Sequence, residues 1–321
     1  MTKEKVVIGL DTSNYTTSLG VVNLQGQLIQ DERILLPVKK GNLGLRQSEA
    51  LFHHIKGLPL LAQRTSGYEI VAISSAIKPR PIEDSYMPVF LAAESFGKTM
   101  SNLWDVAFYG FSHQEGHIKA GLWSTGVKPS KPFLALHLSG GTTEALKVIP
   151  KDIGYEIEII GGTTDISAGQ FIDRIGVKLN LPFPAGPHLE KILENQDLQL
   201  LKGNPPISVK GNYISFSGPE THFQREIKEA SNPVEIAYGV FQCVARSLYK
   251  WIDNLLKSYP SDEILFVGGV ASNKIIRSYL QDKLQKRLKL YFGDGQYCSD
   301  NGVGIAVLGV ESYLDHKKQL K

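Results

Sequence analysis

KVVIGLDTSNYTTSLGVVN, residues 5–23, opens a pattern of strands and helices that the chain uses twice. Residues 5–12 form a continuous apolar run, which is typical of a buried strand. Residues 17–23 predict a second strand after a polar turn, and residues 28–36 predict a third. Helices and strands then alternate, with helices expected at 47–64 and 88–103, strands at 69–75 and 105–112, and a last helix at 113–123.

The same order of elements returns in the second half of the chain. FLALHLSGG (133–141) predicts a strand that leads into a glycine turn, and TEALKVIP (143–150) and YEIEIIGG (155–162) predict two more strands. After a long insertion, helices are expected at 234–257, 273–286 and 301–315, and strands at 262–268 and 288–292. The order β-β-β-α-β-α-β-α therefore occurs in both halves.

This repetition predicts a duplicated α/β fold with two lobes. We expect an N-terminal lobe at 1–125 and a C-terminal lobe at 126–321, with a helical insertion at about 165–232. Strands that alternate with helices predict parallel sheets in each lobe. Two such lobes on either side of a cleft form the architecture of actin, the sugar kinases and the Hsp70 chaperones, an analogy that fixes no reaction.

Turns that precede helices in such a fold are expected to bind phosphate through backbone N–H groups. Three stretches fit this role: DTSNYTTS (11–18), HLSGGTTE (137–144) and VGGVASN (267–273). The last contains Gly268 and Gly269, which allow a phosphate to approach the backbone closely. Each stretch alone could be an ordinary turn, but the three occupy matched points of the duplicated pattern.

The composition is that of a soluble globular protein. The 321 residues are 42% hydrophobic and 21% charged, and the net charge of +3 neither requires nor excludes an RNA partner. Two cysteines form no disulfide framework, which fits a reducing compartment. No apolar run approaches the ~18 residues of a membrane span. We therefore expect a cytoplasmic protein.

HQEGH, residues 113–117, places two histidines one helical turn apart. Zinc proteases carry H-E-x-x-H, whereas here Gln114 follows the first histidine and Glu115 comes one residue later. On a helix this displaces the carboxylate by roughly 100°, so the spacing excludes the protease mechanism. The two histidines could be ligands in another kind of metal site, or they could be two unrelated histidines on the surface of a helix.

A metal site needs a third ligand, and Asp300 in CSDNGVGIA (298–306) is a candidate. The alternative is a helix N-cap, where aspartate is favoured. Cys298 could be a soft ligand or, more simply, a small buried thiol.

Six stretches now resemble the tRNA threonylcarbamoyladenosine transferase family, formerly called O-sialoglycoprotein endopeptidases. HQEGH is similar to its H-x-E-G-H motif, and LSGGTT is similar to S-G-G-[HN]-T. The other stretches, in family order, are DISAGQFIDRIGVKLNLPFPAGP (165–187), ISFSGPET (214–221), GGVASNKIIR (268–277) and SDNGVGIA (299–306). With GLDTS at the start, the resemblance covers residues 9 to 306, nearly the whole chain.

The resemblance implies an actin-like two-lobe fold and transfer of a threonylcarbamoyl group from an adenylate to N6 of adenosine 37 in tRNA. It also implies one divalent metal, iron or zinc, and an adenine nucleotide as ligands. By matching motif positions, His113, His117 and Asp300 are expected to bind the metal. The expected nucleotide and substrate residues are Ser139, Gly140 and Gly141 for phosphate, Asp173 and Glu190 for ribose, and Gly186 and Asn273 for adenosine.

His137 stands where archaeal and eukaryotic members carry a metal-binding tyrosine. It could be a fourth ligand, or a strand-end histidine that bonds to the backbone. A shell of three histidines and one carboxylate suits zinc or iron better than magnesium.

The chain departs from the family at its first motif, where an Asp-Glu pair is replaced by Tyr15 and Thr16. Asp11 could supply the missing catalytic carboxylate, or it could cap its own turn. The following family motif is also replaced, by LGLRQSEALFHHI (43–55), which contains His53 and His54. These differences predict a divergent paralogue.

Three activities remain open. The chain could be an acyl transferase of the threonylcarbamoyl type, a non-catalytic nucleotide-binding paralogue that acts as a partner subunit, or a small-molecule carbamoyltransferase or kinase of the same superfold. A tRNA partner could use the basic segments Lys128–Pro132 and Lys283–Lys289, although such segments are usually solvated faces. We also expect a protein partner or a homo-oligomer, and no membrane.

Overall fold

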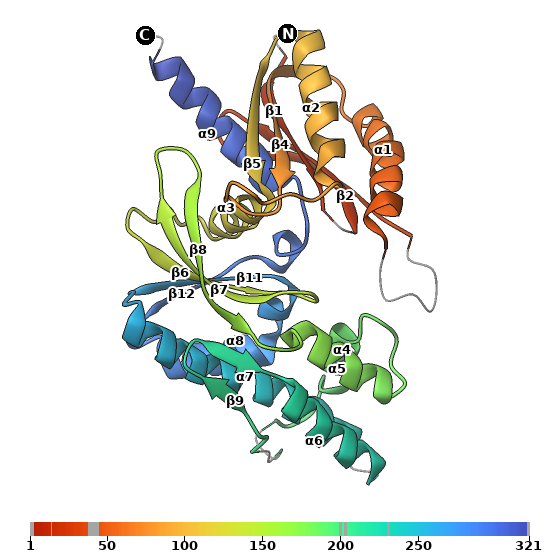
Figure 1. The fold of residues 1–321 in the computed structure, drawn as a ribbon, viewed down its shortest axis with the longest axis vertical. Helices are drawn as coiled ribbons and strands as arrows, with labels where there is room; N and C mark the ends of the chain where they lie inside the picture. The colour runs from red at the N-terminus through yellow and green to blue at the C-terminus, as the bar shows by residue number, and fades with distance from the viewer. Residues whose placement is uncertain are drawn as a thin grey trace. The chain divides into compact units, whose positions relative to one another are not determined.

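The contacts within the computed structural model divide the chain into two compact units (Figure 1). The structure describes residues 3–13, 15–37, 45–198, 201, 204–229 and 232–319. Unit 1 comprises Met1–Ser130, Ile149–Ile157 and Ser299–Lys321, and unit 2 comprises Lys131–Val148 and Glu158–Cys298. The grouping of Ser299–Lys321 with the N-terminal residues differs from the division into 1–125 and 126–321 that the sequence suggested.

Unit 1 is built on a five-stranded sheet in the order β3-β2-β1-β4-β5. Its elements are β1 (Lys5–Thr12), β2 (Thr16–Asn23), β3 (Leu28–Leu35), α1 (Gln47–Gln63), β4 (Glu69–Lys78), α2 (Phe90–Trp104), β5 (Ala107–Ser112), α3 (His113–Thr125) and α9 (Val303–Gln319). The last helix packs against β1, β2, β4 and α3, which is why the C-terminal stretch belongs to this unit.

The sheet of unit 1 is mixed, so the expectation of a parallel sheet was wrong for its first strands. β1 pairs with β2, and β2 with β3, in antiparallel fashion, whereas β1 pairs with β4, and β4 with β5, in parallel. The physical reason is the length of the connections. Only three residues separate β1 from β2 and only four separate β2 from β3, and a parallel pair needs a crossover of a dozen or more residues.

Unit 2 repeats this strand order. Its seven-stranded sheet runs β12-β11-β6-β7-β8-β10-β9, in which the first five strands correspond to β5-β4-β1-β2-β3. The elements are β6 (Phe133–Leu138), β7 (Thr143–Pro150), β8 (Tyr155–Thr163), α4 (Ala168–Lys178), α5 (Gly186–Ile192), β9 (Ser208–Lys210), β10 (Tyr213–Ser215), α6 (Ser217–Lys228), α7 (Pro233–Ser258), β11 (Glu263–Val267), η1 (Gly269–Ser272), α8 (Lys274–Leu284), β12 (Lys289–Phe292) and η2 (Gly295–Tyr297). The predicted order of elements is thus confirmed in both halves.

The core of unit 2 forms largely around α7, the longest of its helices. One face of α7 packs against the sheet and buries Trp251 completely, while its other face carries charged residues. Within the described residues, no helix combines the length and the apolar character that crossing a membrane would require.

Side chains along β1 point alternately to the two faces of the sheet, and this alternation determines which of them face α9. Val6, Ile8 and Leu10 lie in the core shared with α1 and α2. Gly9 faces the other way, because a Cβ atom built on it would come within 2.3 Å of the Ala306 backbone nitrogen in α9. Successive side chains of a strand point to opposite faces, so Asp11 lies on the same face as Gly9, toward α9.

Candidate metal centre and nucleotide residues

His113 and His117 are positioned by the start of α3, which follows β5 without a loop. The Ser112 hydroxyl accepts a hydrogen bond from the Glu115 backbone N–H at 3.2 Å, and the Glu115 carboxylate accepts one from the Ser112 N–H at 2.8 Å. This reciprocal pair is a capping box, which fixes the first turn of a helix. The glutamate of HQEGH therefore holds the helix start, and it is not placed as a general base.

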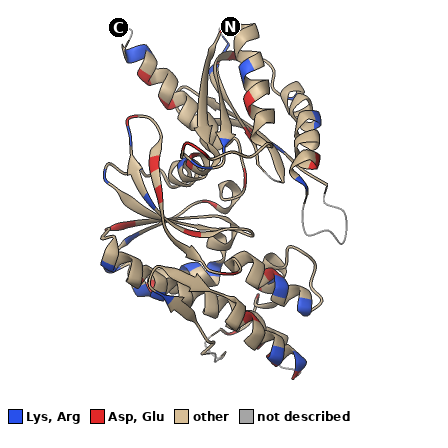
Figure 2. Cartoon of the chain, in the orientation of Figure 1, with Lys and Arg blue, Asp and Glu red and all other residues tan. Residues whose placement is uncertain are grey.

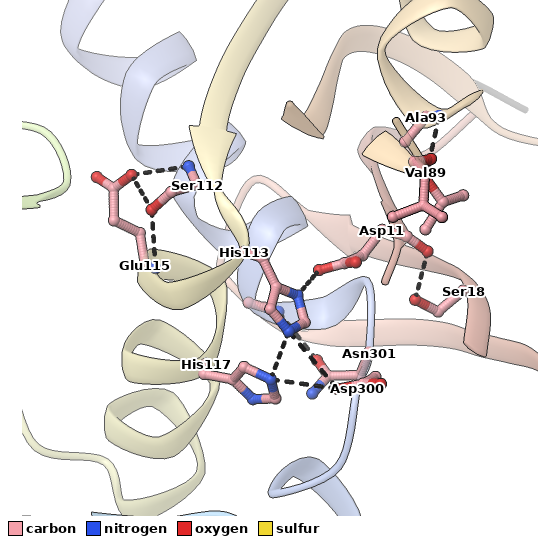
Figure 3. Close-up of polar contacts among 12 residues, drawn as sticks. Asp11, Ser18, Val89, Ala93, Ser112, His113, Glu115, His117, Asp300 and Asn301 are labelled. Atoms are coloured by element: carbon pink, nitrogen blue, oxygen red, sulfur yellow. Dashed lines mark hydrogen bonds and ion pairs between the residues drawn. The ribbon is translucent and has the colours of Figure 1, made fainter. Parts of the chain in front are cut away.

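Asp300 joins the two histidines, and the three side chains point toward one another (Figure 3). The Nε2 atoms of His113 and His117 are 3.0 Å apart. Asp300 Oδ1 lies 3.3 Å from Nε2 of His117 and 3.6 Å from Nε2 of His113. The three residues expected to bind a metal are thus brought together by the fold, all within unit 1.

These separations fit a bound metal ion. Ligands at about 2.0–2.1 Å from a tetrahedral zinc ion lie about 3.3 Å from one another, and the three observed distances scatter around that value. Two imidazole nitrogens and a carboxylate oxygen are also donors that zinc and iron accept. Cys298 is not part of this donor group in the described structure; its thiol is buried, and burial raises its pKa.

The close packing of α3 against α9 places Asp300 beside the histidines. A Cβ atom at Gly304 would come within 2.0 Å of the Gly116 carbonyl oxygen, so the two helices touch where neither has a side chain. Gly116 lies between the two histidines in α3, and Asp300 lies just before α9. The glycines therefore set the distance between the ligands from the two helices.

Asp11 orients His113 from the side opposite the candidate metal. Its Oδ2 atom lies 2.6 Å from Nδ1 of His113, and its side chain is almost fully buried. An Nδ1–H that donates to Asp11 leaves the Nε2 lone pair for a metal, as carboxylate–histidine–metal arrangements require. The structure places Asp11 within β1, paired with Ser18, which confirms the strand predicted over 5–12 and differs from the assignment of Asp11 to the phosphate turn 11–18.

The charges of this site shift the pKa values of its members in opposite directions. Burial lowers the pKa of His113, but the Asp11 and Asp300 carboxylates outweigh burial and raise it to about 9. Burial raises the pKa of Asp300, but hydrogen bonding from His117 and the nearby imidazoles hold it well below its usual range. The carboxylates therefore favour a protonated His113 ring in the metal-free protein, and a metal ion that binds at Nε2 would displace that proton.

The two glycine turns of unit 2 lie side by side. Ser139, Gly140 and Gly141 follow β6, and Gly268 and Gly269 follow β11, its parallel neighbour. Gly268 has a φ of 97°, and a Cβ atom there would meet the Leu138 carbonyl oxygen at 2.3 Å. By contrast, a Cβ atom at Gly140, Gly141 or Gly269 would meet no protein atom within 4 Å. Packing therefore does not explain these three glycines.

The remaining nucleotide candidates lie on elements that bond to one another. Asp173, in α4, accepts a hydrogen bond from the Ala185 N–H at 2.7 Å, directly before Gly186 begins α5. Glu190, in α5, accepts one from the Lys274 N–H of α8 at 3.1 Å. Asn273 caps α8 through the N–H groups of its first turn. Burial raises the pKa of Asp173 against the effect of its backbone hydrogen bonds.

His137 lies in β6 of unit 2, opposite Glu144 in the β6–β7 pair. Leu136 and Leu138 point into the core of unit 2, so by alternation His137 faces the other side of the sheet. Its role as a fourth ligand stays a prediction.

Figure 2 marks Lys and Arg in blue and Asp and Glu in red, and in the segment Lys283–Lys289 three of the cations are paired with carboxylates. Lys283 pairs with Asp282 at 2.9 Å, Lys289 pairs with Glu263 at 3.2 Å, and Arg287 pairs with Asp253. Lys128 and Lys131 are exposed. An RNA contact at either segment stays a prediction.

Sequence reasoning did not assign a role to His54, which the structure places next to this site. The His54 ring is fully buried, and its Nδ1 atom lies 2.9 Å from the Thr17 hydroxyl. The signal was present in α1, because His54 falls in phase with the buried residues Ala50, Leu58 and Leu61, whereas His53 does not.

The similar solved structures have low sequence identity to this chain, so they show its fold and not its function. HypF of T. kodakarensis is 14% identical with a TM-score of 0.61, over 98% of this chain and 48% of that one. A ROK family glucokinase from Streptomyces griseus, in complex with glucose and AMPPNP, is 12% identical with a TM-score of 0.55, over 95% of this chain and 99% of that one. These similarities confirm the actin-like α/β fold expected from the sequence.

Curated relatives are closer. The chain is 28% identical to the tRNA N6-adenosine threonylcarbamoyltransferase of Thermus thermophilus, covering 94% of this chain and 91% of that protein. It is also 28% identical to a probable bifunctional tRNA threonylcarbamoyladenosine biosynthesis protein of Thermoplasma acidophilum, where 96% of this chain spans 56% of the relative's length. The chain thus spans about half of that archaeal protein. The family model described as tRNA N6-adenosine threonylcarbamoyltransferase matches residues 86–307, and the chain belongs to that family.

Proposed function

We propose that this chain is a metal- and adenine-nucleotide-binding transferase. It would move a threonylcarbamoyl group from threonylcarbamoyl-AMP to N6 of adenosine 37 in tRNA. The observation that carries the proposal is the group of three donor atoms from His113, His117 and Asp300, with Asp11 holding one ring, in a member of this family.

The donor atoms of His113, His117 and Asp300 would hold one divalent ion, zinc or iron rather than magnesium. When bound, such an ion acts as a Lewis acid that stabilises negative charge on a phosphate leaving group. His113 is held for this task by Asp11, so its Nε2 atom needs no reorientation when the ion arrives.

The glycine turns of unit 2 would bind the nucleotide. The open backbone at Gly140 and Gly141 supports phosphate binding by N–H groups, and Asp173 and Glu190 would face the ribose. In the transfer, a bond forms between adenosine N6 and the carbamoyl carbon as the bond to the phosphate oxygen breaks. AMP leaves with the electron pair, and the amine proton passes to water, so no protein nucleophile is needed.

The test measures transfer from threonylcarbamoyl-AMP onto unmodified tRNA, with the modified nucleoside detected by mass spectrometry. The wild-type chain with zinc or iron is expected to transfer the group, and Asp300→Asn is expected to lose both metal and activity. His222→Ala is the control, because His222 lies in α6 of unit 2, where it pairs with Glu226 and contacts the Phe223 ring. An active Asp300→Asn variant without metal would overturn the metal-dependent mechanism.

A second candidate is a non-catalytic nucleotide-binding subunit. It is favoured by one observation: at the place of the family's acid pair, the side chain of Tyr15 is 41% exposed, Thr16 is buried, and neither is a carboxylate. Metal and adenine nucleotide binding without any transfer, alone or with the other components of its cell, would establish this function instead.

A further inference from the structure

His54 is an imidazole at the centre of unit 1 for which the proposed reaction has no use. It lies in α1, has no exposed surface, and lies outside residues 86–307, which the family model matches. Buried polar side chains are normally retained for a hydrogen bond that something depends on. The question is which group depends on His54.

One contact of His54 fixes the start of β2. Its Nδ1 atom lies 2.9 Å from the Thr17 hydroxyl, and Thr17 pairs with Thr12 across the β1–β2 hairpin. The Thr17 side chain is itself confined, because it packs against Gly57 one turn further along α1, where an added Cβ would stand 3.0 Å from the hydroxyl oxygen. The ring therefore connects α1 to the closed end of the hairpin.

The remaining ring nitrogen of His54 makes no contact of this kind: within the described residues its Nε2 atom has no hydrogen-bond partner. Burial lowers the pKa of His54, and the backbone of Ser13 and the more distant carboxylates of Asp11 and Asp300 oppose this effect. The connection of His54 to β1 therefore runs through Thr17, which pairs with Thr12, the residue that follows Asp11.

We propose that His54 is a positioning residue for the metal centre, holding the start of β2 against the end of β1 so that the Asp11 carboxylate stays against Nδ1 of His113. The inference rests on the proposed metal function, because its purpose is to keep Nε2 of His113 directed at Asp300 and His117. Without the ring, Thr17 loses its hydrogen bond to α1, while the strand pairing of Thr12 and the bond from its hydroxyl to the Val89 carbonyl remain. The 2.6 Å contact of Asp11 with His113 then has less support from α1.

The first measurement is zinc affinity of the full chain by competition with a chelator. His54→Leu keeps the apolar volume and removes both hydrogen-bonding nitrogens, and it is expected to weaken zinc binding about tenfold, the lower end of the range for outer-shell partners. His54→Gln keeps polar atoms within reach of Thr17 and is expected to recover most of the affinity. Leu58→Ala, in the same helix, destabilises the core and is expected to leave zinc affinity unchanged.

The second measurement needs no metal. The His113 N–H in its short bond to Asp11 is expected to give a far-downfield proton NMR resonance in the metal-free wild type and in Leu58→Ala, and to disappear in His54→Leu. If wild type and His54→Leu bind zinc equally and both keep the resonance, the inference is wrong. If Leu58→Ala loses affinity as much as His54→Leu, the effect is general destabilisation and the inference is also wrong. If wild type binds no zinc but only His54→Leu loses the resonance, the metal proposal fails while the positioning of Asp11 by His54 stands.

Discussion

His113 can direct only one of its two ring nitrogens at Asp300, and Asp11 accepts from the other. Because Asp11 is buried on β1 and Asp300 precedes α9, one imidazole lies between carboxylates from two distant parts of the sequence. At the scale of the residue, the two carboxylates therefore act on different nitrogens of the same imidazole ring. Asp300 faces the ion, and Asp11 sets the tautomer.

This division of tasks predicts the effect of Asp11→Asn. The amide keeps the size of the side chain and loses its charge, so it no longer favours the Nδ1–H tautomer of His113. Zinc affinity is expected to fall by about 10- to 100-fold, measured by isothermal titration calorimetry. Asp105→Asn makes the same chemical change at an exposed position with φ 51°, which asparagine accepts, and should bind zinc as wild type does. Equal loss in both variants would contradict a specific role for Asp11.

A second prediction concerns acid stability. Burial of His54 lowers its pKa from 6.5 to about 4, against the opposing effects of the Ser13 backbone and the Asp11 and Asp300 carboxylates, and His53 lowers it further. The folded state then binds fewer protons than the unfolded state, so this stability is complete above pH 6.5 and is lost as the pH falls from 6.5 to 4. Linkage gives a loss of about 3 kcal/mol.

The measurement is urea unfolding of the metal-free protein between pH 7.5 and 4.5, for wild type and His54→Gln. The difference between the two curves isolates His54 from the other titrating groups. Wild type should lose its advantage progressively below pH 6.5. Parallel curves across this interval would mean that the ring is not held neutral in the folded state.

At the scale of the element, the contact between α3 and α9 sets the geometry of the site. Gly304→Ala places a methyl group against the Gly116 carbonyl oxygen, and the helices must move apart. Unfolding free energy is expected to fall by about 1–3 kcal/mol, with a parallel loss of zinc affinity. Gly218→Ala, at an open position near the start of α6, should instead be neutral or slightly stabilising. Thermal unfolding and zinc titration of both variants test this expectation, and equal stability and zinc affinity in the two variants would contradict it.

The elements themselves could be predicted from the sequence with little error. The apolar run at 5–12 and the capping pattern around HQEGH are local signals, and β1 and α3 lie where these signals indicate. The antiparallel pairing of β1 and β2 could also have been deduced, because residues 13–15 leave no room for a crossover. The sequence left Asp11 in two places, the strand 5–12 and the turn 11–18, because the polar run after Leu10 resembles a turn; the pairing of Asp11 and Thr12 with β2 assigns it to the strand.

The packing of α9 could not be read from the sequence. Its apolar residues indicate a buried helix, but periodicity does not say against which sheet a helix packs. The expected C-terminal lobe followed chain order, whereas α9 returns to β1. The spacing of HQEGH and the carboxylate of Asp300 indicated the candidate metal ligands, and the family resemblance then assigned them to one ion. His54 was missed because the stretch that contains it replaces a family motif.

At the scale of the whole molecule, the two kinds of ligand are expected to act on different units. The three metal candidates lie in unit 1, and the nucleotide candidates from Ser139 to Asn273 lie in unit 2. A ligand stabilises the structure that binds it, by about 2.7 kcal/mol at a concentration of 100 times its Kd. Hydrogen exchange with zinc alone should slow in α3 and around residues 298–306, and exchange with AMPPNP alone should slow around 139–143 and 268–274. The reverse pattern would show that the ligands are wrongly assigned.

The return of α9 to unit 1 has a consequence for synthesis on the ribosome. His113 and His117 leave the exit tunnel long before Asp300, and the whole of unit 2 is translated in between. At ordinary translation rates this interval lasts roughly ten seconds or more. During that time the nascent polypeptide exposes two imidazoles and the sheet surface that α9 later covers, so unit 2 is expected to become protease-resistant before unit 1. Digestion of stalled nascent chains would reveal this order, and it implies that the ion can only be captured once translation is nearly finished.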